Sequence, residues 1–273
     1  MHRYAASTIV ALAASPVLAT PYASSVLSYD AGANAAAGYT TATNALGAAE
    51  RFTGEGVFPS GVTPFNPAFG TDELVSIGSG GHLTLALDRP VTNTGSHRFG
   101  IDLIVFSNSG FIDSSWTDSD PTNDGTGLVG PNPTLFGVGG EATIEVSSDG
   151  TTWHTAAITA FDLLPTLGYS DFTQATPFSP GAVESDFTRA VDPSITRDDL
   201  AGMSLTEIVA LYDGSGGGIG IDISTTGLSS ASFVRFTNNS AEAFEIDAVS
   251  VVPAPGTAAA LAFGLCFASR RRR

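Results

Sequence analysis

The sequence predicts an all-β protein: a jelly-roll-type antiparallel β-sandwich with long loops and one short helix. Its apolar residues occur in short alternating runs, and turn signals rich in Gly, Pro and Asn separate these runs. Alternation with a period of two is typical of half-buried strands, whereas a helix places its apolar residues three and four apart. Many strands with a single helical segment indicate two packed sheets.

The clearest strand pattern runs from Leu83 to Leu87, where three leucines alternate with Thr84 and Ala86. Similar patterns predict strands at residues 144–147, 233–236 and 244–252. Residues 101–106 are apolar except for Asp102, which is typical of a central strand. The helix is expected at residues 205–211, because Ser204 and Glu207 form a capping box at its start.

Asp102 is unusual because it interrupts the apolar strand. A buried carboxylate must be paired or hydrogen-bonded. The chain has few cations, and Arg98 and Arg235 are the candidate partners. We expect a structural ion pair here rather than a ligand site.

The first residues predict a secretory signal peptide, residues 1–19. Arg3 precedes the apolar stretch 9–14, and Val17, Leu18 and Ala19 place small residues where a leader peptidase cuts. A buried N-terminal helix is the alternative, but Ser15-Pro16 breaks the run and the polar chain that follows offers no partner for it. The chain is therefore expected to be exported, with a β-sandwich domain at residues 20–252.

Residues 253–273 combine a proline-containing motif, an apolar run and a terminal cluster of arginines. The apolar run, residues 258–268, partitions into a bilayer, whereas the arginines cannot cross it and stop transfer. The motif is Pro253, Ala254, Pro255 and Gly256, and the cluster is Arg270, Arg271, Arg272 and Arg273.

This order of features resembles the PEP-CTERM sorting signal of bacterial surface proteins. The resemblance implies that an exosortase, a membrane protease or transpeptidase, removes the tail. Ala254 stands where the family has Glu, and the helix of residues 257–269 spans roughly 20 Å of a ~30 Å hydrocarbon core, so the bilayer must thin around it. The alternative is a transmembrane anchor that is never processed.

The segment from Glu145 to Trp153 predicts a hairpin. Asp149-Gly150 at its tip tolerates the positive φ values of a tight turn, and Trp153 on the return strand can pack across the pair. The segment resembles the "SxDG…W" hairpin of discoidin-type and other galactose-binding-like sandwich domains. Residues 244–251 are similar to the last strand of such domains in PEP-CTERM proteins. Both resemblances imply the sandwich fold.

The charge of the chain excludes some partners. Residues 20–252 hold all 27 acidic residues and six arginines, a net charge of about −21, and the chain contains no lysine. Such a surface repels phosphate backbones and anionic headgroups, so neither nucleic acid nor a basic membrane-binding patch is expected. The single cysteine, Cys266, lies in the tail, so the domain has no disulfide.

An acidic loop is the candidate cation site. Carboxylate and amide oxygens crowded into one turn suit Ca²⁺, which takes six to eight oxygen ligands with loose geometry. The alternative is a solvated turn, since Asp and Asn favour turns for their own sake. The expected ligands are Asp113, Asp118, Asp120, Asn123 and Asp124.

The sequence favours a non-enzymatic function. His82, His97 and His154 lack zinc-ligand spacing, and no nucleophile elbow is present. We expect an exported, C-terminally sorted protein of the cell surface or extracellular matrix that contacts polysaccharide. Trp116 could stack on a sugar or anchor its own loop. The alternative is a secreted hydrolase that uses a carboxylate pair, whose separation the sequence does not reveal.

Overall fold

The computed structural model describes residues 19–54, 56, 60–115, 127–137, 140–160, 164–173, 175, 179 and 181–254, with backbone alone at 158–160. The strands are β1 (Ala23–Asp30), β2 (Val75–Ile77), β3 (His82–Thr92), β4 (Leu103–Phe106), β5 (Gly110–Phe111), β6 (Leu135–Phe136), β7 (Glu141–Ser147), β8 (His154–Ala160), β9 (Ile219–Ile221), β10 (Ser230–Asn238), β11 (Phe244–Ile246) and β12 (Ala248–Val251). The helices are α1 (Leu205–Tyr212) and the short 3₁₀ turns η1 (Ala42–Ala45), η2 (Arg98–Gly100), η3 (Arg197–Leu200) and η4 (Ser224–Thr226).

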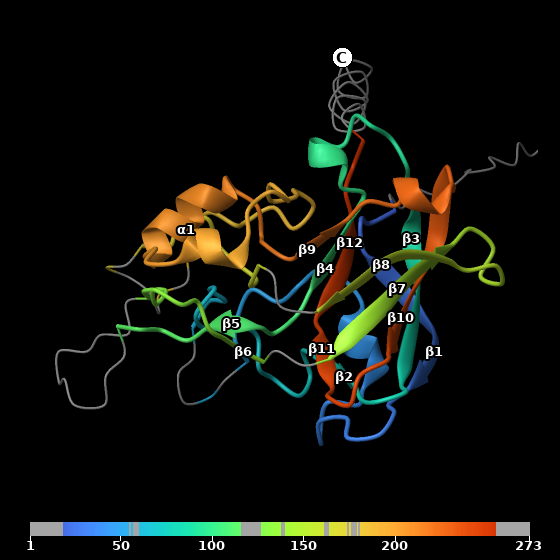
Figure 1. Ribbon diagram of the computed structural model, residues 1–273, viewed down its shortest axis with the longest axis horizontal. Coiled ribbons are helices and arrows are strands. Elements are labelled where there is room, and N and C mark those ends of the chain that lie inside the picture. Colours follow the sequence, from blue (N-terminus) through green and yellow to red (C-terminus); the bar gives the residue numbers. More distant parts are fainter. Residues whose placement is uncertain are drawn as a thin grey trace, which may run out of the picture.

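Two antiparallel layers form a β-sandwich (Figure 1). The first layer is a five-stranded sheet in the order β1-β3-β10-β7-β8. The second contains β12-β4-β9 and the pair β11-β2. Only Asp247 separates β11 from β12, so one nearly continuous segment of the chain contributes a strand to each of the two small sheets. The predicted all-β sandwich is confirmed.

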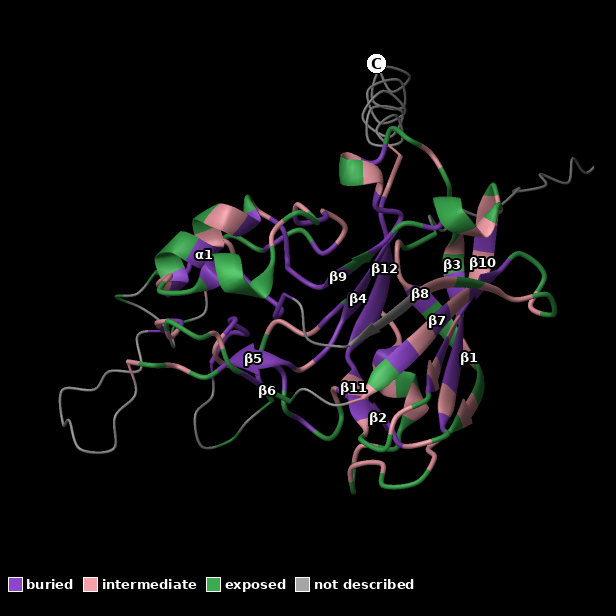
Figure 2. Ribbon diagram, in the orientation of Figure 1, coloured by how far each residue is buried: buried purple, intermediate pink, exposed green. Residues whose placement is uncertain are grey.

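The main core fills the space between the layers, and Figure 2 shows buried positions along the strands of both. Leu83, Leu85 and Leu87 of β3 all face this core, as their alternation predicts. Burial of such side chains is the main stabilising term of the fold, at about 25 cal/mol per Å² of apolar surface. The opposite layer contributes Val75, Ile77, Leu103, Val105, Ile219, Ile221, Phe244, Ile246, Val249 and Val251.

A second core lies beside the sandwich. We call this part, residues 110–136 and 164–212 as far as they are described, the side lobe; it holds α1, β5 and β6 (Figure 1). Its fully buried side chains include Phe111, Leu167 and Tyr212. The Tyr212 hydroxyl donates to the carbonyl oxygen of Pro165 at 2.9 Å, and burial raises the pKa of this phenol. Sequence periodicity indicates no such second cluster.

The predicted helix is confirmed, and it ends one residue later than expected. The hydroxyl of Ser204 accepts from the backbone N–H of Glu207, whose carboxylate accepts in turn from the N–H of Ser204 at 2.8 Å. These backbone bonds lower the pKa of Glu207. Leu205, Ile208 and Tyr212 then turn inward, so this helix is held by its cap and by the core of the side lobe.

No helix among the described residues is long and apolar enough to cross a membrane. The predicted membrane helix, residues 257–269, lies outside them, as do residues 1–18 of the predicted signal peptide.

Candidate functional site

The structure describes the two ends of the acidic loop, and the side chain of Asp113 joins them. Oδ1 of Asp113 accepts from the N–H and hydroxyl of Ser115, at 2.9 and 2.6 Å, and from the N–H of Leu128 at 2.9 Å. Oδ2 accepts from the N–H of Gly127 at 3.0 Å. Both oxygens are therefore committed to the two ends of the loop, which makes Asp113 a structural clamp.

The rest of the predicted calcium site lies outside the described residues, as does Trp116. Within the described part of the chain, no group of three acidic, His or Cys side chains is arranged to hold a metal ion. Calcium binding stays a prediction, and it depends on the tip of the loop: Asp118, Asp120, Asn123 and Asp124.

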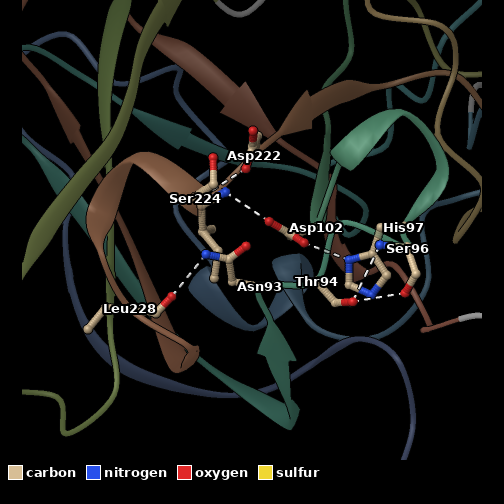
Figure 3. Close-up of polar contacts among 9 residues, drawn as sticks. Asn93, Thr94, Ser96, His97, Asp102, Asp222, Ser224 and Leu228 are labelled. Atoms are coloured by element: carbon tan, nitrogen blue, oxygen red, sulfur yellow. Dashed lines mark hydrogen bonds and ion pairs between the residues drawn. The ribbon is translucent and has the colours of Figure 1, made fainter.

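The buried partner of Asp102 is His97, which corrects the expectation that Arg98 or Arg235 pairs with it (Figure 3). His97 Nδ1 lies 2.6 Å from Asp102 Oδ1, and Oδ2 accepts from the N–H of Ile223 at 2.9 Å. The two side chains are almost completely buried. The tight turn of η2 brings His97 back to Asp102, which directly precedes β4. Arg98 pairs instead with Asp213, and Arg235 with Glu145.

This His–Asp pair resembles part of a catalytic triad only superficially. A triad needs a nucleophile hydrogen-bonded to the second imidazole nitrogen. Nε2 of His97 is buried and makes no hydrogen bond within the described residues. The pair therefore ties the loop before β4 to the turn before η4.

The outer face of the five-stranded sheet carries a second polar cluster. Arg235 of β10 bonds Oε2 of Glu145 on β7 through Nε and Nη2, at 2.8 and 2.7 Å. The Trp153 ring reaches across β7 and lies with its centroid 4.3 Å from Cζ of Arg235. The predicted β7–β8 hairpin is confirmed, and Trp153 packs on β10 beyond it.

The hairpin tip follows the sequence prediction. Gly150 has φ +75°, the left-handed conformation that glycine adopts without strain. Oδ1 of Asp149 accepts from the N–H groups of Thr151 and Thr152 at 2.8 and 2.7 Å, which lowers the pKa of Asp149. The tip is therefore a self-contained turn whose polar groups are already engaged.

Carboxyl groups with raised pKa values gather where β11 meets β12. Burial raises the pKa of Asp247 well above its usual value, and its two oxygens accept from the Glu50 N–H at 3.2 and 3.0 Å. Burial also raises the pKa of Glu50, and the negative charges of Glu73 and Asp72 raise it further. Among the described residues, this cluster is where a carboxylate pair for hydrolysis would be sought.

The boundaries of the predicted domain lie side by side. The N–H of Val251 donates to the carbonyl oxygen of Pro21 at 2.6 Å, and Tyr22 forms a β-bridge with Ser250. Two residues of the predicted sorting motif, Pro253 and Ala254, follow Val252 and are half-buried. Pro255, Gly256 and the arginines Arg270 to Arg273 lie outside the described residues.

Comparison with known proteins adds no family. No protein-family model matches the chain. A search of curated proteins finds no significantly similar sequence either.

Proposed function

We propose that the chain is an exported surface protein whose sandwich is displayed at the cell envelope or in the extracellular matrix. The observation that carries this proposal is the position of the domain boundaries. Residues 20–22 and 250–252 belong to adjoining parts of the sheets, and the two predicted signals begin just beyond them. Because both predicted signals lie outside these paired segments, the sheets keep their described pairing when both signals are cut away.

Sorting is tested by mass spectrometry of the protein recovered from the surface of its own cells. We expect a C-terminus between Pro253 and Thr257, because the motif lies there and an exosortase-type enzyme is the proposed partner. Recovery of surface protein that retains Arg270 to Arg273 would show an unprocessed membrane anchor instead. Protein that stays in the cytoplasm with residues 1–19 attached would overturn export itself.

The proposed ligand of the displayed domain is polysaccharide, and the proposed contact is Trp116. A tryptophan stacks on the apolar face of a sugar ring, and a strongly acidic surface excludes anionic polymers by repulsion. Neutral or cationic glycans are therefore the candidates. Binding of the exported protein to immobilised neutral polysaccharide should fall at least tenfold in Trp116→Ala. The matched control, Trp153→Ala, should bind like the wild type because Trp153 is engaged by Arg235.

Calcium is the proposed cofactor, and its ligands are the acidic side chains at the tip of the loop. Asp113 is not among them, because both of its oxygens accept hydrogen bonds at the two ends of the loop. A cation that binds only the folded state stabilises it by RT ln(1 + [L]/Kd), about 2.7 kcal/mol at a hundredfold excess over Kd. Millimolar Ca²⁺ should raise the Tm by several degrees, and a chelator should reverse the rise. The effect should vanish when Asp118, Asp120 and Asp124 are changed together to Asn. An equal rise with Na⁺ at matched ionic strength would mean screening alone.

The rival function, a secreted hydrolase, has one observation in its favour: the raised pKa of Glu50, which neighbouring acids help to produce. A carboxyl whose pKa is raised by its surroundings can act as a general acid. Release of reducing ends from polysaccharide by the exported protein, abolished in Glu50→Gln, would support the rival. The absence of release across a panel of polysaccharides would leave the binding function.

A further inference from the structure

The first residue after the predicted signal peptide faces a carboxylate. The backbone nitrogen of Thr20 lies 2.5 Å from Oδ2 of Asp88, and the Thr20 hydroxyl lies 3.0 Å from the same oxygen. Asp88 belongs to β3, which is 68 residues away along the chain. Both residues are exposed to solvent, so reagents can reach the backbone nitrogen of Thr20.

The neighbouring backbone bonds hold Thr20 at this place. Tyr22 accepts from the N–H of Asp88 at 3.0 Å on one side and forms a bridge with Ser250 of β12 on the other. Pro21 accepts from the N–H of Val251. Residues 20–22 thus join the edge of the five-stranded sheet to the edge of the opposite layer, and Thr20 is the first of them.

We propose that cleavage of the Ala19–Thr20 bond creates an ion pair between the new α-ammonium group of Thr20 and the carboxylate of Asp88. Hydrolysis consumes one water: the carboxylate product stays on Ala19, and the amine product stays on Thr20. The amine takes up a proton at neutral pH, because the ordinary pKa of an α-amino group is about 7.7–8.0. This inference rests on the proposed export and deepens it by assigning the processing site a structural partner.

Cleavage changes the chemistry of this contact without moving its atoms. In the uncut chain, the backbone nitrogen of Thr20 offers Asp88 one neutral amide N–H, beside the hydroxyl of the same residue. After cleavage the same nitrogen carries a positive charge and three donors, and charge-assisted hydrogen bonds are roughly twice as strong as neutral ones. Processing therefore strengthens the existing attachment of the N-terminal segment to β3 once the leader is gone.

The absence of lysine makes the ion pair directly measurable. The α-amino group is the only amine in the chain, so reductive methylation with ¹³C-formaldehyde labels Thr20 alone. The full chain is expressed with its leader, and the processed protein is purified from outside the cytoplasm. Its mass gives the N-terminus, and an NMR titration of the labelled methyl groups gives the α-amino pKa.

The test compares wild type with Asp88→Asn, which keeps an acceptor oxygen at the same place but removes the charge. We expect the α-amino pKa of the wild type to exceed that of Asp88→Asn by about 0.5 unit or more, since an opposite charge favours the ammonium form. Asp30→Asn is the matched control. It removes one negative charge at the far end of β1, where Asp30 bonds the N–H of Gly32, and it should titrate like the wild type.

Three outcomes overturn the inference, and they are distinguishable. An N-terminus at Thr20 with equal pKa values in wild type and Asp88→Asn would refute the ion pair and leave export standing. Exported protein that begins at another residue would refute the cleavage site alone. Protein found only with residues 1–19 attached would refute the proposed function together with the inference.

Discussion

Replacing Asp102 by Ala should lower the free energy of unfolding of the sandwich more than replacing any exposed acid does. The substitution removes the carboxylate that lies 2.6 Å from Nδ1 of His97 and accepts from the N–H of Ile223 at 2.9 Å. Both groups are buried, so water cannot replace the lost acceptor unless the loop before β4 opens. The change therefore leaves two polar groups without partners inside the protein.

The expected loss of unfolding free energy is about 3–5 kcal/mol, the usual cost of breaking a buried pair by removing one partner. This agrees with about 1–3 kcal/mol for each buried polar group that loses its hydrogen bond. In a domain of this size one kcal/mol corresponds to about 2–4 °C, so Tm should fall by roughly 6–20 °C. The loss is large compared with a typical total stability of about 5–15 kcal/mol.

Urea unfolding of the exported protein, followed by Trp fluorescence, measures the change. Asp222→Ala is the matched control, because exposed Asp222 bonds only the N–H of Ser224, at 2.7 Å, among the contacts that the structure describes for it. Its cost should be about 1 kcal/mol, as for a capping residue. A second comparison replaces both partners, His97→Leu with Asp102→Leu, which should cost less than Asp102→Ala alone because only the N–H of Ile223, and no longer the imidazole of His97, is left without its partner.

A loss for Asp102→Ala no greater than that for Asp222→Ala would refute this reasoning. It would mean that water reaches the pair, and that the loop holding His97 is not packed as tightly as its burial indicates. A double replacement more costly than the single one would also contradict the argument, since packing rather than hydrogen bonding would then govern the site.

Three further predictions concern pH, backbone packing and the outer face. Burial raises the pKa of Asp247, so between the ordinary pKa of about 4 and the raised folded pKa the folded state keeps a proton that the unfolded chain releases. The free energy of unfolding should therefore fall by up to about 1.4 kcal/mol per pH unit within that window and level off above it. Asp247→Asn should flatten this slope, and identical pH profiles would contradict it. Gly78→Ala should lower the free energy of unfolding in urea by about 1–3 kcal/mol or more, since the added Cβ would lie 2.2 Å from a backbone carbonyl oxygen. Gly95→Ala, where the added Cβ meets open space, should leave the free energy of unfolding nearly unchanged. A double-mutant cycle of Trp153→Leu and Arg235→Leu should give a coupling of about 0.5–1 kcal/mol, and zero coupling would mean that the ring contact contributes nothing.

Most of the long strands and the helix could be predicted because their signals are local. Alternation places Leu83 and Leu85 on one face whatever the partner strand is, and the Ser204 cap bonds its own helix. The missed strand β1 lies at a sheet edge and is mostly exposed. It therefore lacks the apolar alternation of a strand that has neighbours on both sides and one buried face. The short strand β9 was missed for another reason: it has three residues, and glycines precede and interrupt it.

The contacts of the candidate site join segments that are far apart in the sequence, and local sequence signals do not predict them. The sequence by itself determined the net charge, the hairpin tip at Gly150, the export and sorting signals proposed at the two ends, and the need of Asp102 for a buried partner. Only the tertiary structure decided that the partner is His97, that Trp153 packs on Arg235 beyond its own hairpin, and that Thr20 meets Asp88. The physical reason is that such contacts depend on strand order and register, and these emerge from the packing of the whole core rather than from any one segment.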